Sequence, residues 1–254
     1  MRWKSTHASV TGKAHTDRGE GGQDFSSACS IRIGNADIFI GLAADGAGST
    51  TDGGQGAAIA CASLCTQITG ALGKDSDLSR ITDEDIKGWI AASREAIVAG
   101  AEKSGKRLRD FACTVLGSVA GNGRAVFFQI GDGAIVAGSG AEYDTVFWPE
   151  QGEYANTTYF ITDEDFQNHL HISHRESPDE IALFTDGLQA LVLSFSQKKA
   201  HAGFFRPLFE ALRNNPDNET NAFSGTLAAF LGREDIGARS DDDKTLVLAV
   251  RTEG

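Results

Sequence analysis

Residues 37–48 read DIFIGLAADGAG, an apolar run that stops abruptly at the pair Asp45-Gly46. Residues 180–188, EIALFTDGL, repeat this arrangement, because their apolar run stops at Asp186-Gly187. In residues 241–250, DDDKTLVLAV, the order is reversed and an acidic triplet precedes the apolar run. Strand ends that converge on aspartates build an oxygen-ligand site for a hard divalent cation. These segments therefore predict a metal site at one end of a β-sheet structure.

The overall composition narrows the possible partners. The formal net charge of −12 argues against a nucleic-acid partner, because binding to phosphates requires a basic face. The charge is compatible with an enzyme in which bound metal neutralises a phosphate. No apolar run reaches the roughly 18 residues of a membrane span, and no export signal opens the chain. We expect a cytoplasmic monomer without a membrane partner.

The cysteines give no sign of a metal cluster or a disulfide framework. Cys29, Cys61, Cys65 and Cys113 show no CxxC spacing, and Cys61 and Cys65 lie in an alanine-rich helical pattern. We interpret all of them as small buried residues of a reduced protein.

The order of the predicted elements sets the fold class. Strands are predicted over residues 3–11, 25–33, 37–44, 112–120, 125–130, 134–138, 145–148, 157–161, 180–185 and 244–251. Helices are predicted over residues 55–72, 82–104, 187–194, 200–213 and 218–231. Runs of hairpins separated by helices favour an α+β fold, in which two antiparallel sheets pack face to face with helices outside. No linker or repeat divides the chain, so we predict one domain over residues 1–254.

Six short motifs, taken in order, resemble the metal-dependent protein phosphatases of the 2C type, and most closely their bacterial branch. The motifs run Gly12-Lys13-Ala14-His15, Gly22-Gln23-Asp24, Ala44-Asp45-Gly46-Ala47-Gly48, Gly131-Asp132-Gly133, Thr185-Asp186-Gly187 and Asp242-Asp243-Lys244-Thr245. An Asp-Gly pair alone is common at turns. The specificity of the resemblance comes from the order of the motifs and from their strand or turn contexts, which extend from about residue 8 to 250.

The resemblance implies an α/β/β/α sandwich with two metal ions, Mn²⁺ or Mg²⁺, at one end of the sheets. By motif, Asp45 would bridge both ions, the Gly46 carbonyl would ligate one, and Asp186 and Asp242 would complete the second. Asp24 would hold metal-bound waters, and Asp132 matches a position that helps to hold a third ion in some members. Two such ions would activate a water for attack on phosphorus.

The chain also departs from the family pattern. Many members carry a phosphate-binding arginine where this chain has Gly19, so Arg18, His15 or Lys13 would have to orient the phosphate. Animal members often have a histidine at the position of Ala47, and many relatives have a glutamate at that of Gln23. We predict that Arg18 contacts the substrate phosphate and that His15 protonates the leaving alkoxide.

The leading hypothesis is thus a metal-dependent phosphatase of phosphoserine or phosphothreonine in proteins, acting opposite a Ser/Thr kinase. An inactive member that binds phosphoproteins or a regulator is the alternative, because the arginine and the glutamate are both missing. A Mg²⁺-dependent hydrolase of another phosphate ester, such as a nucleotide, is a third possibility. Metal-dependent turnover of para-nitrophenyl phosphate and a panel of substrates would separate the three.

Overall fold

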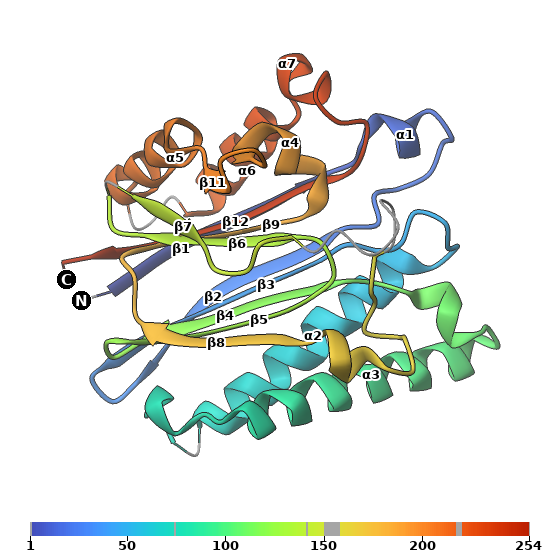
Figure 1. Ribbon diagram of the computed structural model, residues 1–254, viewed down its shortest axis with the longest axis horizontal. Helices are drawn as coiled ribbons and strands as arrows, with labels where there is room; N and C mark the ends of the chain where they lie inside the picture. Colours follow the sequence, from blue (N-terminus) through green and yellow to red (C-terminus); the bar gives the residue numbers. More distant parts are fainter. Residues whose placement is uncertain (1, 74, 141, 150–157, 217–219, 254) are drawn as a thin grey trace.

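The computed structural model describes residues 2–73, 75–140, 142–149, 158–216 and 220–253. Two antiparallel sheets lie face to face and helices cover both outer faces (Figure 1). The predicted α/β/β/α sandwich is therefore confirmed. The first sheet has the order β1-β12-β9-β6-β7 and the second has the order β2-β3-β4-β5-β8.

The strands of the first sheet are β1 (Arg2–Val10), β12 (Lys244–Thr252), β9 (Glu180–Phe184), β6 (Ala134–Gly138) and β7 (Tyr143–Thr145). Those of the second are β2 (Phe25–Ile33), β3 (Ala36–Ala44), β4 (Val115–Gly121), β5 (Arg124–Ile130) and β8 (His171–Glu176). A small hairpin joins β10 (Leu193–Ser194) to β11 (Lys199–Ala200). Both ends of the described chain therefore lie in the first sheet, where β1 pairs with β12.

The helices are α1 (Lys13–Thr16), α2 (Gly53–Leu72), α3 (Asp83–Ser104), α4 (Gln189–Val192), α5 (Ala202–Asn214), α6 (Thr220–Leu231) and α7 (Glu234–Gly237). Short 3₁₀ turns span Leu78–Arg80, Leu108–Phe111, Phe166–His169 and Asp186–Leu188. Helices α2 and α3 cover the second sheet, and α4, α5 and α6 lie over the first (Figure 1). None of the helices in the described part of the chain is both long and apolar enough to cross a bilayer.

The apolar run of β3 explains why the sheets stack. Successive side chains of a strand point to opposite faces. Accordingly Ile38, Ile40 and Leu42 pack with α2 and α3, whereas Phe39 and Ala43 pack against the other sheet. Because both faces of β3 are buried, its sequence is continuously apolar rather than alternating.

Helix α3 begins with a capping box. The Thr82 side chain accepts a hydrogen bond from the Asp85 backbone N–H at 3.2 Å. The Asp85 carboxylate accepts one in return from the Thr82 N–H at 2.8 Å. This reciprocal capping box satisfies two donors of the first turn, which gives Asp85 a structural role.

Several predicted boundaries were wrong. The strand predicted over 145–148 is instead β7, which ends at Thr145. Of the strand predicted over 157–161, residues 158–161 form no strand, and residue 157 lies outside the described residues. The helix predicted over 187–194 is reduced to α4. Strand β8, of sequence HISHRE, was missed because it carries few apolar residues; it is an edge strand of the second sheet, where it pairs with β5 and stays half exposed.

Candidate metal centre at one end of the sheets

The sheet pairing brings the predicted aspartates to one end of the sandwich. Asp24 precedes β2 and Asp45 follows β3, and these strand ends pair at Phe25 and Ala44. In the other sheet, Leu246 pairs with Phe184, which places Asp186 and Asp242 at the corresponding end. Asp132 lies in the turn between β5 and β6 at this same end.

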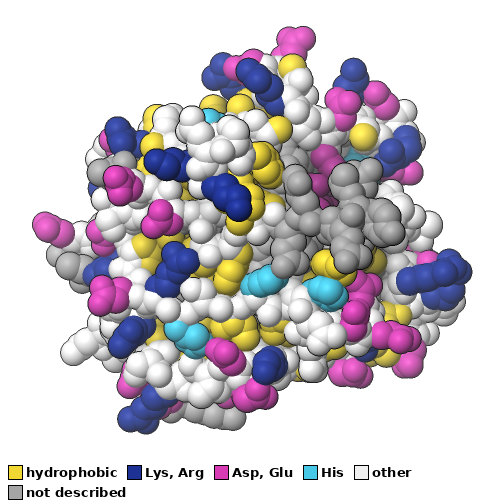
Figure 2. Space-filling view, viewed as in Figure 1, with side chains coloured by type: hydrophobic (Ala, Val, Ile, Leu, Met, Phe, Trp, Pro, Cys, Tyr) yellow, Lys and Arg dark blue, Asp and Glu magenta, His cyan; other side chains and the backbone are white. Residues whose placement is uncertain are grey.

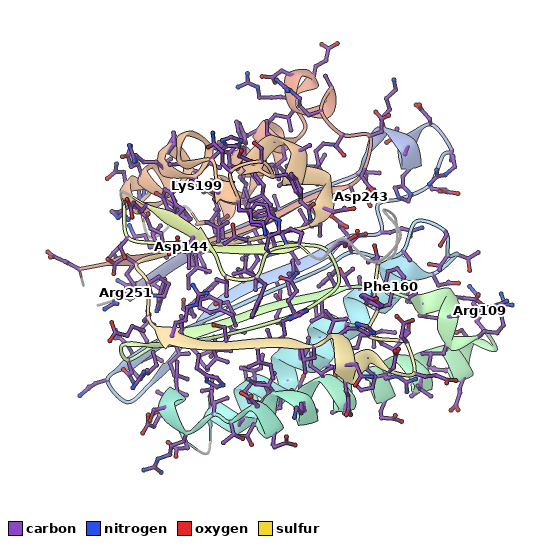
Figure 3. All side chains as sticks on the ribbon, in the orientation of Figure 1. Arg109, Asp144, Phe160, Lys199, Asp243 and Arg251 are labelled. Atoms are coloured by element: carbon purple, nitrogen blue, oxygen red, sulfur yellow. The ribbon has the colours of Figure 1, made fainter. Side chains whose placement is uncertain are left out.

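Figure 3 marks the location of this end. Asp243 lies where β12 begins, near α1, whereas Arg251 lies at the opposite end of the same strand. On the face shown in Figure 2, basic side chains are scattered among acidic ones rather than gathered in one patch.

Glycines follow two of the aspartates because the backbone is crowded there. A Cβ on Gly46 would overlap the carbonyl carbon of Gly53, at the start of α2, and a Cβ on Gly187 would overlap the Asp243 carbonyl oxygen. The Asp-Gly pairs of the sequence thus mark points where the chain passes another backbone segment directly after a site aspartate.

The aspartates form a cluster of like charges. Burial is the main cause that raises the pKa of Asp45 well above its usual range, and the charges of Asp24 and Asp186 raise it further. Burial, followed by the charges of Asp132 and Asp242, raises the pKa of Asp186 to about 7. Burial also raises the pKa of Asp24 to about 6, although hydrogen bonds from Thr245 and Thr185 oppose this rise. A divalent cation would relieve this repulsion.

Two carboxylate oxygens of the cluster also need a partner. Asp24 Oδ1 and Asp186 Oδ1 are sealed from solvent and accept no hydrogen bond from the described residues. Unpaired buried acceptors are costly unless a cation or an ordered water faces them. The residues present therefore fit a hard cation with oxygen ligands.

The cluster is nevertheless not a compact cage. Within the described residues, no three His, Cys, Asp or Glu side chains converge as a ready-made metal site. Hard cations such as Mg²⁺ keep several waters and take few protein ligands. A sparse arrangement of carboxylates, with room for water between them, is consistent with that preference.

Neighbouring hydroxyl groups orient the aspartates. Thr185 Oγ1 donates to Asp24 Oδ2 at 2.8 Å, and it accepts from the Thr245 N–H at 3.2 Å. Thr114 Oγ1 accepts from the Asp45 N–H at 2.9 Å, and the Thr114 N–H donates to the Asp45 carbonyl at 2.8 Å. Sequence reasoning missed the role of Thr114, which adjoins no acidic motif.

Asp243 joins β12 to the loop that leads into β2. Its carboxylate accepts from the Gly12 N–H at 2.6 Å and from the Gln23 N–H at 2.5 Å, and its side chain is buried. The sequence analysis also missed this role of Asp243. The three consecutive aspartates at 241–243 look alike in the sequence, which does not show which carboxylate faces the metal centre and which binds the loop before β2. Asp242 Oδ1 instead accepts from the Asp243 N–H at 2.8 Å.

Gln23 and Asp132 are each tied to a neighbouring segment. With its amide oriented to donate, Gln23 Nε2 lies 3.1 Å from the Gly46 carbonyl oxygen, which is the predicted backbone ligand. Asp132 Oδ2 accepts from Thr158 Oγ1 at 2.5 Å, and its carbonyl accepts from the Gln189 amide. These contacts hold the segments that carry Gly46 and Asp132 in place, and each contact involves a residue other than the clustered aspartates.

The predicted phosphate contact and the predicted acid lie together near α1. Arg18 Nε donates to Glu20 at 2.7 Å, and Arg18 Nη2 lies 3.2 Å from His15 Nδ1. Arg18 is half exposed, whereas His15 is buried, with Nε2 3.9 Å from the Asp243 carboxylate. Lys13 borders a cavity next to α7 together with Lys244, whose Nζ donates to the Asp242 carbonyl at 2.7 Å.

Comparison with known proteins places the chain in a family. Residues 11–232 match the sequence profile of the family described as Protein phosphatase 2C. Serine/threonine-protein phosphatase 3 of Escherichia coli (strain K12) is 33% identical over 263 aligned positions, which cover all of both chains.

Solved structures share the fold at low sequence identity. The catalytic domain of the serine threonine protein phosphatase PstP, in complex with two manganese ions, aligns with a TM-score of 0.61 at 14% identity, covering 99% of both chains. A bacterial serine phosphatase aligns with a TM-score of 0.63 at 12% identity, covering 98% of both chains. From the matched residues and the full-length relative, this chain belongs to the protein phosphatase 2C family of serine/threonine protein phosphatases.

Proposed function

We propose that this protein hydrolyses phosphoserine and phosphothreonine in phosphorylated proteins, using a centre of two divalent cations, Mn²⁺ or Mg²⁺. The observation that carries the proposal is the convergence of carboxylates from both sheets at one end, with buried oxygens of Asp24 and Asp186 left without a partner among the described residues. The full-length relative named as a serine/threonine-protein phosphatase supports the substrate class.

The proposed ligands divide between the sheets. Asp45 and the Gly46 carbonyl follow β3, whereas Asp186 follows β9 and Asp242 precedes β12. Burial, followed by the charges of Asp24, Asp186 and Asp242, raises the pKa of Asp45, so we assign Asp45 as the ligand shared by the two cations. When bound, the two cations would neutralise the phosphoryl group and acidify the water that attacks phosphorus. Asp24 would hold water beside them, and Asp132 would help to hold a third ion.

The chain's own side chains would then bind the substrate and orient it. Arg18 is the proposed phosphate contact, because it is half exposed and lies on the loop that Asp243 fixes next to the cluster. The role of His15 as the acid for the leaving alkoxide stays a prediction. Its ring is 3% exposed, so direct transfer to a substrate requires movement of residues 12–24.

The decisive experiment is turnover of a phosphothreonine peptide and of para-nitrophenyl phosphate, with and without Mn²⁺. We expect metal-dependent turnover that Asp45→Asn and Asp186→Asn each reduce by at least about a hundredfold, because each removes a ligand charge from the reacting centre. Asp241→Asn is the matched control, since Asp241 is exposed and adjoins the site aspartate Asp242. Metal binding without turnover of either substrate would instead favour the phosphoprotein-binding alternative.

The cellular setting remains part of the proposal. A protein phosphatase of this type would act opposite a Ser/Thr kinase, and we propose that the chain does so as a cytoplasmic monomer. Dephosphorylation of a kinase-treated lysate, followed by phosphopeptide mass spectrometry, would identify the substrates.

A further inference from the structure

Thr185 lies where β9 leaves its partner strand and enters the turn that carries Asp186. Its N–H donates to the Thr245 carbonyl at 3.3 Å, which continues the pairing of β9 with β12 by one residue. Two residues in such a pair normally exchange both backbone bonds. Here the Thr245 N–H donates to the Thr185 hydroxyl oxygen instead, at 3.2 Å. The Thr185 carbonyl is thereby left to accept from the Leu188 N–H at 3.2 Å, which closes the turn.

The hydroxyl of Thr185 is not used as its position predicts. Thr185 is the N-cap of the short turn, where a threonine hydroxyl usually accepts from an N–H of the turn itself, but it makes no such bond. Its oxygen accepts from the Thr245 N–H, so its single proton is available for another acceptor. That acceptor is Asp24 Oδ2, at 2.8 Å. The direction of this bond is fixed, because an ionised carboxylate can only accept.

The bond gives the two oxygens of the Asp24 carboxylate different roles. Thr185 is 1% exposed, so water cannot readily replace its hydroxyl at Oδ2. Asp24 Oδ1 is sealed from solvent and accepts no hydrogen bond from the described residues, so it is the oxygen left for a water or a cation. The bond also crosses the sandwich, since Thr185 follows β9 of the first sheet and Asp24 precedes β2 of the second.

We propose that Thr185 is a positioning residue of the metal centre, whose hydroxyl holds Asp24 Oδ2 so that Oδ1 keeps a fixed orientation toward metal-bound water. The inference rests on the proposed function, because Asp24 is there assigned to hold water beside the cations. It concerns binding of the metal as well as turnover, so it can be measured without a substrate.

The test compares Thr185→Val and Thr185→Ser by calorimetric titration with Mn²⁺ and by kinetics on a phosphothreonine peptide, both at pH 8. Valine keeps the shape of threonine but removes the hydroxyl, whereas serine keeps the hydroxyl and removes only the methyl group. Burial raises the pKa of Asp24 to about 6, so this carboxyl is ionised at the pH of the test. Thr6→Val is the matched control, because Thr6 is a buried threonine in the middle of β1 whose hydroxyl has no partner among the described residues.

We expect Thr185→Val to weaken Mn²⁺ binding and to lower kcat by about tenfold each, the lower end of the range for loss of a hydrogen bond to a charged group. KM for the peptide should change by less than about twofold, because Thr185 is buried and does not reach the substrate. Thr185→Ser and Thr6→Val should stay within about twofold of the wild type in every quantity. A threonine needed only for packing would not show this rescue by serine.

A double-mutant cycle with Asp24→Ala tests whether Thr185 acts through Asp24. In the Asp24→Ala background, Thr185→Val should change Mn²⁺ binding by less than about twofold, because the acceptor of the hydroxyl is already absent. The same tenfold loss in both backgrounds would show that Thr185 acts through the turn at Asp186 instead, and would overturn the proposal.

Equal losses in the Val and Ser variants, or wild-type behaviour of Thr185→Val, would also overturn it. Should Thr185→Val fail to fold, Thr185→Cys takes its place with the same expected losses, because a thiol is only a weak donor. A wild-type protein that binds Mn²⁺ without turnover would contradict the proposed function, and the titrations would still test the role of Thr185. Failure of the wild type to bind Mn²⁺ would overturn both.

Discussion

Arg18 and Glu20 show how a neighbouring carboxylate can set the availability of a phosphate contact. Arg18 Nε is bound to Glu20 at 2.7 Å, so a substrate phosphate must compete with that carboxylate. We predict that Arg18→Ala raises KM for a phosphothreonine peptide by about tenfold, as expected for loss of a charge-assisted hydrogen bond. Glu20→Gln should lower KM by about twofold, because an exposed ion pair is weak.

The opposite signs of these two effects make the measurement specific. Steady-state kinetics on one peptide, with saturating Mn²⁺, is sufficient. Unchanged KM in Arg18→Ala would show that another group binds the phosphate, and Lys13→Ala would then be the next variant to measure.

The raised pKa of Asp186 makes a second prediction at the residue scale. This pKa is about 7 in the folded protein, well above the usual value of a carboxyl group in an unfolded chain. Between those values the folded state binds more protons than the unfolded state. This group's contribution to the free energy of unfolding therefore falls as pH rises toward 7.

Asp186→Asn removes this penalty. Without metal, in EDTA, we expect the variant to gain stability relative to the wild type as pH is raised from roughly 5 to roughly 8, with the full gain above the folded-state pKa. Urea unfolding at several pH values measures the difference. A difference that does not vary with pH would contradict the prediction.

At the scale of elements, Asp243 joins the start of β12 to the loop that contains α1. Asp243→Ala would leave the buried N–H group of Gly12 and the partly buried N–H group of Gln23 without their acceptor. We expect a loss of about 2–6 kcal/mol in the free energy of unfolding, at roughly 1–3 kcal/mol for each group. Asp241→Ala is the control, because that exposed side chain should cost less than about 0.5 kcal/mol.

Urea unfolding would measure both variants. If Asp243→Ala were no less stable than Asp241→Ala, the carboxylate would not be what holds residues 12–23 against β12.

At the scale of the whole molecule, the proposed ligands come from both sheets. We propose that residues 1–254 fold as one domain, because a shared core that includes Phe39, Phe127 and Leu183 joins the sheets. A cation held by Asp45 on one side and Asp186 on the other would bind the folded state alone. At a hundred times its Kd, such a ligand stabilises the folded state by about 2.7 kcal/mol.

For a chain of this size that stabilisation corresponds to a rise in Tm of roughly 5–10 °C. Differential scanning calorimetry with and without Mn²⁺ tests this rise, which EDTA should reverse and Asp45→Asn should abolish. A shift that persists in Asp45→Asn would place the stabilising cation elsewhere.

The sequence by itself determined most of the strands and the place of the aspartates at their ends. The apolar run 37–44 is a strand buried on both faces, and the Asp-Gly pairs that follow β3 and β9 lie where two backbones crowd together. The sequence did not reveal β8, because an edge strand needs little apolar surface and its hydrogen bonds come from partners 44 to 52 positions away (Phe128 pairs with Ile172, and Arg124 with Glu176).

Only the tertiary structure decided what the side chains next to the motifs do. Asp242 and Asp243 are neighbours of one type, yet the carboxylate of Asp243 accepts from the Gln23 N–H, 220 residues away, whereas Asp242 adds its charge to the cluster around Asp45. Thr185 and Asp24 likewise adjoin strands of different sheets, and no local pattern connects them. Local sequence specifies which backbone segments are strands and turns, but hydrogen bonds between side chains depend on distances that exist only after the sheets have packed.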